Sequence, residues 1–472
     1  MDYQDSLRYI YSFTNYEVTP ATAYAPERFN LARVEQLLAA LGKPHMQFQA
    51  VHIAGTKGKG STAAMLESVL RAAGHSTALY TSPHLHTFRE RIRVGGEMIS
   101  QANVVAGVEK LKPLAAQIPG LTTFELITAL AFDYFVSQKS RDLATARGVE
   151  IAVLEVGLGG RLDATNVVLP RVSVITSISY DHIAILGNTL ALIAREKAGI
   201  IKGGVPVVTA PQQDEVLRVI EEIAREKNAP LITVTPDLRF EVAGHRSQVS
   251  SRRSQEASFK SQIVQLETWD MGPETRDLGL VTCHLPLLGR HQLTNATTAL
   301  AAIHVLREQG LAIPNGAIRD GLASMEWQGR FEILEREPFF IVDGAHNADS
   351  AHQLAQTLRD LFPRARLHFT FGASSDKDIA GMFAELLPHA TSLTLTRSRN
   401  PRAADPARLA ELAARHNVNT LIAPDVTSAL RDARQHAERG DVVCTTGSLF
   451  VVAEAREALL AEQGKVVETD AD

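Results

Sequence analysis

Short apolar runs alternate with longer amphipathic segments along most of the chain. Residues 48–54 (FQAVHIA) and 76–80 (STALY) are apolar runs of strand length. Between them, apolar side chains recur every three or four residues from Ala63 to Ala73, and Gly74 follows as a helix stop. The pattern predicts a strand, a helix and a second strand, which is the unit that builds parallel sheets.

Further helices and strands follow in the same alternation. Helices are expected over 123–137, 189–199 and 212–226, and strands over 151–156, 172–178 and 205–210. Strands that alternate with helices predict one doubly wound α/β domain. Residues 245–262 are rich in serine and lack apolar periodicity, so we expect a mobile insertion there.

A second α/β series begins near residue 330 with the apolar strand FFIVD. Before it, one helix is expected from about Asn295 to Glu308, and a short helix reaches about Met325. A chain of 472 residues exceeds what one hydrophobic core usually organises. We therefore expect a larger domain over residues 1–326 and a smaller, Rossmann-like α/β domain over residues 330–472.

Composition excludes several classes of protein. Hydrophobic residues at 45% and charged residues at 21% describe an ordinary globular chain, and the net charge of -5 gives no overall attraction to nucleic acid. Two cysteines make a disulfide framework improbable. The N-terminus does not resemble a signal peptide, and no apolar run approaches membrane-spanning length. We expect a cytoplasmic protein that binds neither nucleic acid nor membrane.

Residues 51–62 (VHIAGTKGKGST) lie between the first predicted strand and the first predicted helix. Glycines at 55, 58 and 60 let backbone amides point at phosphate oxygens, and the helix N-terminus favours negative charge. Lys59 can reach a terminal phosphate, and Ser61 or Thr62 offers a hydroxyl group near a metal.

The same stretch departs from the usual phosphate-binding loop. The usual loop has four residues between its first glycine and the Gly-Lys pair, with Ser or Thr directly after the lysine. Here two residues separate Gly55 from Gly58, and Gly60 follows Lys59. The segment is therefore either a phosphate site of another kind or a glycine turn with surface lysines.

Polar side chains at other predicted strand ends suggest a metal site. Glu155 lies near the carboxyl end of an apolar strand, where parallel sheets bind ligands, and a buried carboxylate is costly unless it is paired or bound to a metal. Ser82 and His182 follow two other strands. Their convergence is compatible with a magnesium site, and structural pairing of Glu155 and a purely structural role for His182 are the alternatives. Lys197, on a predicted helix, would by itself be interpreted as a surface charge.

The second half offers a further set of polar candidates. Asp343 ends the strand FFIVD, and His346 follows it at a helix start, where Asn347 is a plausible cap. Arg330, at the domain boundary, could complement phosphate charge or lie on the surface. Arg89, Arg91 and Arg93 form an alternating basic stripe that either faces an acidic ligand or is solvated.

These residues lie in motifs that resemble the folylpolyglutamate synthase and dihydrofolate synthase family, relatives of the Mur ligases. The matching segments include GTKGKGS, YTSPHL, TTFELIT, LEVGLGGRLDATN, SYDHIAILGNT, REKAGIIK, LGRHQLTNATTAL, GRFE and VDGAHN. They follow the family's order from about residue 25 to the last helix. The family's own loop has this shortened form, which favours the phosphate site over a simple turn.

The resemblance implies a P-loop-type ATPase domain, a smaller C-terminal domain and ATP-dependent amide ligation between them. The implied reaction uses ATP and Mg²⁺ to add L-glutamate to dihydropteroate, or to the γ-carboxylate of folates, through an acyl phosphate. A monomer is implied as well. A Mur-type ligase acting on a uridine-linked cell-wall precursor is the nearer alternative, and a nonenzymatic ATP-binding switch is a more distant one.

The resemblance also implies roles for individual residues. ATP phosphates would be held by Gly58, Lys59, Gly60 and Ser61. ATP would also be contacted from the domain junction and the second domain by Asn295, Arg330 and Asp343, with His346 close to the phosphates. Magnesium would be held by Ser82, Glu155, His182 and a carbamate on Lys197. The pterin would contact Phe124, Glu125, Leu162 and Asp163. The residues implied in catalysis are Lys59, His182 and Lys197. Lys57 departs from the family, which usually has asparagine there, and could touch phosphate or solvent.

Overall fold

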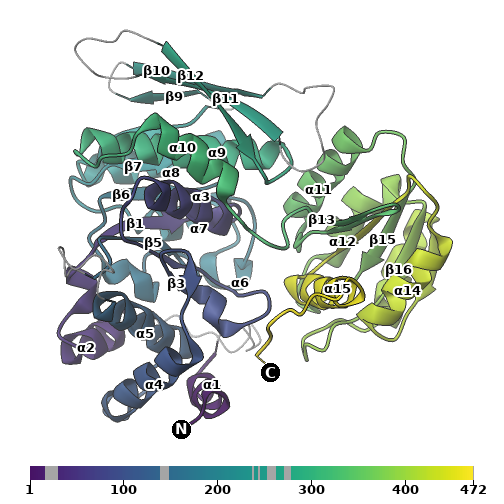
Figure 1. Ribbon diagram of the computed structural model, residues 1–472, viewed down its shortest axis with the longest axis horizontal. Helices are drawn as coiled ribbons and strands as arrows, with labels where there is room; N and C mark the ends of the chain where they lie inside the picture. The colour runs from purple at the N-terminus through teal and green to yellow at the C-terminus, as the bar shows by residue number, and fades with distance from the viewer. Residues whose placement is uncertain are drawn as a thin grey trace.

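Three β-sheets organise the part of the chain that the structure describes (Figure 1). The computed structural model describes residues 1–15, 30–138, 148–235, 239–242, 245–251, 262–269 and 278–470. Its sheets contain eight, four and six strands. No helix among these residues is long and apolar enough to cross a membrane.

The largest sheet has the order β4-β3-β2-β5-β1-β6-β7-β8. Its strands are β1 (Gln49–Ala54), β2 (Thr77–Tyr80), β3 (Ile92–Val94), β4 (Glu97–Met98), β5 (Ile151–Glu155), β6 (Val172–Ile175), β7 (Val207–Thr209) and β8 (Leu231–Thr233). Six strands run parallel, while β3 and β4 add an antiparallel edge. The segment after β1 lies at a topological switch point, because β1 pairs with β5 on one side and β6 on the other.

Helices cover both faces of this sheet. One face packs against α3 (Lys59–Ala72), α9 (Arg290–Glu308) and α10 (Asn315–Ser324). The other carries α1 (Tyr3–Tyr11), α2 (Ala32–Ala40), α4 (Gln101–Ala115), α5 (Thr123–Ser137), α7 (Leu190–Ala198) and α8 (Asp214–Glu226). Alternate β1 side chains serve the two cores, since Val51 and Ile53 face α3 whereas Ala50 faces away from it. The predicted doubly wound domain is confirmed, although α9 begins five residues before the expected Asn295.

The four-stranded sheet corrects one prediction. It contains β9 (Arg239–Val242), β10 (His245–Ser251), β11 (Gln262–Trp269) and β12 (Leu278–Leu285) in antiparallel pairing, and it lies above α9 and α10 in Figure 1. Gln262 begins β11, and the insertion expected over 245–262 is also a strand rather than irregular at residues 245–251, while its mobility stays a prediction. These residues form a strand because β9 and β11 satisfy their backbone groups, although the sequence lacks apolar alternation. Residues 252–261 lie outside the described residues.

The third sheet has the order β13-β14-β18-β15-β16-β17. Its strands are β13 (Glu332–Arg336), β14 (Phe339–Val342), β15 (Leu367–Phe371), β16 (Ser392–Leu395), β17 (Asn419–Ile422) and β18 (Val442–Thr446), all parallel except β13. Its helices are α11 (Ala348–Leu361), α12 (Ile379–Leu386), α13 (Pro406–Ala413), α14 (Val426–His436) and α15 (Leu449–Glu462). The predicted smaller α/β unit is thereby confirmed in kind. The domain limits at 326 and 330 stay a prediction.

Candidate active site

The glycine-rich loop turns sharply between β1 and α3. Gly58 is the helix N-cap with φ of +86°, and a Cβ there would lie 2.1 Å from Asn295 Oδ1 of α9. A Cβ on Gly60 would lie 2.9 Å from the Trp327 ring. A side chain at either position would therefore have to displace Asn295 or Trp327. The backbone N–H groups of Thr56 and Lys57 both donate to the Ser177 carbonyl, which fixes the start of the loop.

A lysine and a carboxylate meet just beyond this loop. Lys59 Nζ lies 3.8 Å from Glu155 Oε1, and the Ser82 N–H donates to Glu155 Oε2 at 3.2 Å. Burial raises the pKa of Glu155, while the nearby Lys59 charge acts in the opposite direction. Ser61 is buried in the first turn of α3, and the buried Thr62 hydroxyl has no hydrogen-bond partner in the described structure. Polar groups thus converge where phosphate and a cation would lie.

Lys197 is a buried lysine rather than a surface charge. Its side chain is enclosed at the end of α7, and Nζ donates to the Gly55 carbonyl at 2.8 Å. Burial, followed by repulsion from Lys59, lowers the pKa of Lys197 to about 7. A substantial fraction of Lys197 is therefore neutral near pH 7. The neutral form of an amine is the form that reacts with carbon dioxide.

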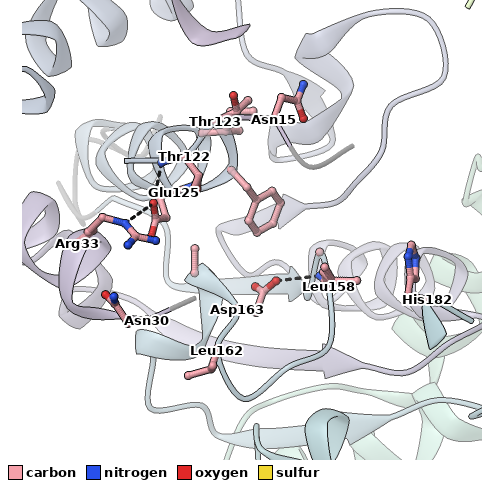
Figure 2. Close-up of a pocket in the computed structure, with 14 residues that line it drawn as sticks. Asn15, Asn30, Arg33, Thr122, Thr123, Glu125, Leu158, Leu162, Asp163 and His182 are labelled. Atoms are coloured by element: carbon pink, nitrogen blue, oxygen red, sulfur yellow. Dashed lines mark hydrogen bonds and ion pairs between the residues drawn. The ribbon is translucent and has the colours of Figure 1, made fainter. Parts of the chain in front are cut away.

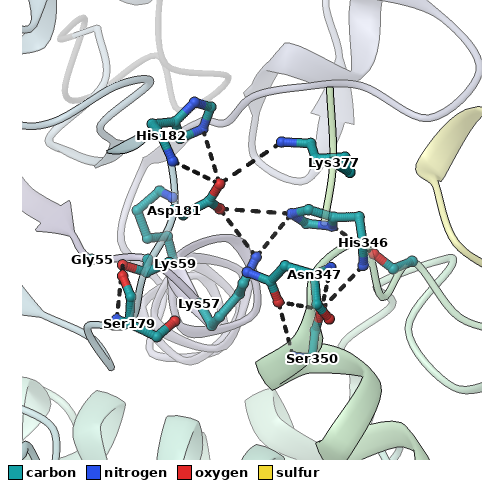
Figure 3. Close-up of polar contacts among 12 residues, drawn as sticks. Gly55, Lys57, Lys59, Ser179, Asp181, His182, His346, Asn347, Ser350 and Lys377 are labelled. Atoms are coloured by element: carbon teal, nitrogen blue, oxygen red, sulfur yellow. Dashed lines mark hydrogen bonds and ion pairs between the residues drawn. The ribbon is translucent and has the colours of Figure 1, made fainter. Parts of the chain in front are cut away.

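A charged network joins the phosphate loop to the smaller domain (Figure 3). Lys57 Nζ donates to His346 Nε2 at 2.8 Å and lies 3.3 Å from Asp181 Oδ2. Lys377 Nζ and His182 Nε2 each lie 3.8 Å from Asp181 Oδ1. Asp181 is therefore the centre of a network to which loops of the eight-stranded and six-stranded sheets contribute. Lys57 contacts these groups rather than solvent.

The neighbours of Asp181 and His346 determine the charge state of each side chain. Burial alone would raise the pKa of Asp181, but attraction from Lys57, His182 and Lys377 holds it well below its usual range. The Lys57 charge, followed by burial, lowers the pKa of His346. His346 Nδ1 donates to the Gly344 carbonyl, so Nε2 is free to accept from Lys57. Asp181 is thus an anion at neutral pH, and His346 is neutral.

The remaining predicted ATP residues lie at the junction of the two large sheets. Asn295 donates to Gln292 Oε1 at 2.9 Å on α9. Asp343 accepts from the N–H groups of Phe331 and Ala345, both at 2.9 Å. Arg330 influences both Glu155 and Asp343, since its charge opposes the rise in pKa that burial imposes on each carboxylate. The structure brings these residues toward the glycine-rich loop, and their contact with ATP stays a prediction.

A cavity separate from the charged network has His182 in its lining (Figure 2). All four predicted pterin-side residues line it, and its complete lining is Asn15, Asn30, Arg33, Thr122, Thr123, Phe124, Glu125, Ile127, Gly157, Leu158, Leu162, Asp163, Ala164 and His182. Phe124 packs close to Gly157, where a Cβ would lie 2.6 Å from its ring. The cavity therefore combines apolar walls with a few polar groups, as small-molecule sites commonly do.

Both acids of this cavity already have partners. Glu125 accepts a hydrogen bond from the Thr122 N–H at 2.7 Å, and this bond is part of the N-terminal cap of α5. Glu125 also forms an ion pair with Arg33. Asp163 accepts from the N–H groups of Leu158 and Thr165. Burial raises the pKa of Asp163, and these hydrogen bonds act against that rise. These bonds hold the two carboxylates in place beside the cavity.

The predicted magnesium donors lie at one edge of the sheet without forming a closed cluster. No group of three or more His, Cys, Asp or Glu side chains in the described parts of the chain is arranged to hold a metal. Magnesium, however, is usually held by one or two carboxylates together with substrate phosphates. Glu155, buried with its nearest cation 3.8 Å away, and the low-pKa Lys197 fit that mode of binding. The assignment of all four magnesium ligands, Ser82, Glu155, His182 and carbamylated Lys197, stays a prediction.

Three residues of the site were missed by sequence reasoning. Lys377 follows β15 in the segment SSDKD, so the strand-end rule that singled out Asp343 would have found it. Trp327 contacts the glycine-rich loop from the domain boundary. Arg33 enters the cavity from α2, and no local pattern marks it.

Comparisons with known proteins agree with this geometry. The chain matches the Mur ligase middle domain over residues 128–303 and the Mur ligase, glutamate ligase domain over residues 329–449. Fold and site therefore define an ATP-dependent ligase of the Mur type. The dihydrofolate synthase/folylpolyglutamate synthase of Bacillus subtilis is 34% identical over 97% of this chain and 99% of its own length. The chain belongs to the folylpolyglutamate synthase and dihydrofolate synthase family.

Solved structures extend this relationship to the whole fold. The Mycobacterium tuberculosis folylpolyglutamate synthase complexed with ADP has 31% identity and a TM-score of 0.81, covering 97% of this chain and 99% of that one. E. coli FolC in complex with DHPP and ADP has 31% identity and a TM-score of 0.79, covering 98% and 99%. Binding of adenine nucleotide by these relatives supports ATP as the nucleotide here. The alternative of a ligase for cell-wall precursors is not favoured.

Proposed function

We propose that this protein uses ATP and magnesium to add L-glutamate both to dihydropteroate and to the γ-carboxylate of reduced folates. The observation that carries the proposal is the position of His182. This residue lines the apolar cavity and also lies 3.8 Å from Asp181 in the charged network beside the phosphate loop. A substrate seated in the cavity would therefore extend its carboxylate toward the nucleotide phosphates.

The cavity suits a flat heterocycle with polar edges. Phe124 and Leu162 supply apolar contact, and the bonded carboxylate of Asp163 supplies an oriented acceptor for N–H groups. E. coli FolC, which is similar over nearly its whole length, binds DHPP. This supports a pteroate or folate as the substrate of the present chain.

Catalysis would rest on positioning and charge rather than on a protein nucleophile. A carboxylate is a poor electrophile, and transfer of a phosphoryl group to it gives an acyl phosphate that the amine of glutamate can attack. Lys59 and the amides at the start of α3 would hold the transferred phosphate. Lys57, Lys377 and neutral His346 lie together where the phosphate loop meets the smaller domain, which would deliver glutamate.

Magnesium fits this arrangement through Ser82, Glu155, His182 and carbamylated Lys197. When bound, the ion would offset the charge that accumulates between phosphate and carboxylate. Glu155 is held ready for a cation by the Ser82 N–H. Lys197 has the depressed pKa that carbamylation requires.

The first experiment measures ATP-dependent incorporation of labelled glutamate in parallel reactions with dihydropteroate and tetrahydrofolate. Product from both substrates is expected. Product from one would assign a single step, and product from neither would refute the proposal. A parallel arm with a uridine-linked cell-wall precursor tests the Mur-type alternative, and amide product of any kind excludes a nonenzymatic switch.

We further propose that the active form is a cytoplasmic monomer. The phosphate loop, the network and the cavity are all built from one chain, which supports activity without a partner subunit. Light scattering coupled to size exclusion should give a mass near 51.3 kDa. Activity confined to a dimer of twice that mass, or recovery outside the cytoplasmic fraction of cells, would contradict this proposal.

A further inference from the structure

The segment after α15 leaves the smaller domain and returns to the larger one. Helix α15 ends at Glu462 on the six-stranded sheet, and residues 463–470 then run toward α1 (Figure 1). In that view the yellow end of the chain lies near the purple N-terminal helix. Asp470 thereby reaches residues that precede it by more than 380 positions.

Asp470 is densely hydrogen-bonded at this distant position. Its Oδ1 accepts from the Thr87 hydroxyl at 2.7 Å and the Tyr3 hydroxyl at 2.9 Å. Its Oδ2 accepts from the Phe88 N–H at 2.8 Å, and its backbone carbonyl accepts from Gln4 Nε2 at 2.5 Å. Thr87 and Phe88 are buried and the Asp470 side chain is 24% exposed, so these contacts are partly shielded from water. Hydrogen bonds to an ionised acceptor in such a setting are among the stronger ones in proteins.

Other contacts from the smaller domain hold the loop that contains Thr87 and Phe88. Glu468 forms an ion pair with Arg89, one member of the basic stripe. On α15, Glu457 Oε1 accepts from His86 Nδ1, and Arg456 donates to His86 Nε2, both at 3.2 Å. The His86 side chain is only 3% exposed. The smaller domain therefore holds successive residues of the 82–91 loop, defined as residues 82 to 91.

The 82–91 loop is internally stiff and begins at the candidate metal site. The Glu90 carboxylate accepts from the N–H groups of Leu85, His86 and Thr87 at 2.7 to 3.0 Å. At its first residue, the Ser82 N–H donates to Glu155. Glu90 thus ties residues 85–87 together as one unit, and this unit begins three residues after Ser82.

We propose that residues 463–470 form an interdomain clasp in which Asp470 positions the 82–91 loop, and through it Ser82 and Glu155. The clasp couples the placement of the smaller domain to the geometry of the predicted magnesium donors. Asp470 is a positioning residue because it acts through the loop and touches no substrate. The link to magnesium rests on the proposed function, whereas the clasp itself does not.

The test compares hydrogen exchange in the full-length protein, without ligands, for the wild type, Asp470→Ala and a control. Val466→Ala is the matched control because Val466 lies in the same segment and is 94% exposed. Asp470→Ala should accelerate exchange of the 82–91 amides at least about tenfold, corresponding to about 1.4 kcal/mol. Strands β1 and β5 should exchange as in the wild type. Asp470→Asn, which keeps one acceptor oxygen, should give a smaller acceleration and replaces the alanine variant if that one does not fold.

The outcomes separate positioning from general stability. Acceleration confined to the 82–91 loop supports the clasp. Wild-type exchange in both Asp470 variants, or equal acceleration in β1 and β5, overturns it. In the active enzyme, Asp470→Ala should raise the magnesium concentration needed for half-maximal velocity with little change in kcat at saturating magnesium, whereas an unchanged magnesium dependence refutes the coupling. Because hydrogen exchange needs no turnover, failure of the clasp is distinguishable from failure of the proposed function.

Discussion

The two ends of helix α3 offer a matched pair of glycine substitutions. Gly58 precedes the helix with φ of +86°, and Gly74 follows it with φ of +90°. A Cβ on Gly58 would lie 2.1 Å from Asn295 Oδ1, whereas a Cβ on Gly74 would meet nothing within 4 Å. The two alanine variants therefore share the backbone strain and differ in the steric conflict.

The difference can be worked from these contacts. Alanine in the left-handed region costs roughly 1 to 2 kcal/mol, and both variants should show this loss. Gly58→Ala must in addition displace the Asn295 side chain, which forfeits its hydrogen bond to Gln292 at about 1 kcal/mol and adds about 1 kcal/mol or more of packing strain. At roughly 2.1 cal/mol/K of unfolding entropy per residue, or about 0.7 kcal/mol/K for the larger domain, the excess of about 2 kcal/mol corresponds to a further fall in Tm of roughly 3 °C.

Thermal melts and nucleotide titrations of both variants test this reasoning. Gly58→Ala should melt below Gly74→Ala by that margin and bind a nonhydrolysable ATP analogue at least about tenfold more weakly, because Asn295 and the loop amides are displaced. Gly74→Ala should bind it like the wild type. Equal Tm values for the two variants, together with wild-type nucleotide affinity in Gly58→Ala, would refute the assignment of this loop.

Three other predictions address the cavity, the network and pH. Gly157→Ala places a Cβ 2.6 Å from the Phe124 ring, so the KM for dihydropteroate should rise about tenfold while the KM for ATP stays unchanged in steady-state kinetics; a parallel rise in both would contradict it. Lys57→Asn removes the main cause of the lowered pKa of His346, so an NMR titration should find that pKa higher, and no rise would count against the network. Burial lowers the pKa of the unmodified Lys197 amine to about 7 from 10.5. Without the carbamate, the folded state therefore binds fewer protons between these pH values, and its stability should increase with pH by at most about 1.4 kcal/mol per unit. Melts of Lys197→Met from pH 6 to 9 should show a flatter increase than the wild type, and identical slopes would exclude this contribution.

Most of the fold could be predicted because its elements repeat local patterns. The strands β1 and β5 and the helix α5 lie where apolar periodicity places them, within about a residue. The strand β10 could not be predicted, because its polar sequence has no alternation and its pairing partners are chosen by the path of the chain. The sequence prediction started helix α9 at Asn295 instead of Arg290, because the first turn of the helix is largely polar and carries no apolar periodicity.

The candidate site divides in the same way. Glu155, His182 and Asp343 were found because parallel strands end at one edge of a sheet and ligands bind there. The contact between Lys57 and His346 joins residues 289 positions apart, and no local signal predicts it. The burial of Lys197 was likewise hidden, since a helical lysine is usually solvated.

The amino-acid sequence by itself determined the α/β class, the family and the chemical types gathered for ligation. These follow from periodicities and motifs that involve residues only a few positions apart. Only the tertiary structure decided which charges meet, such as Lys57 with Asp181 and Asp470 with Thr87. The physical reason is that Coulomb and hydrogen-bond energies depend on distance and burial, and both are set by how distant segments pack together.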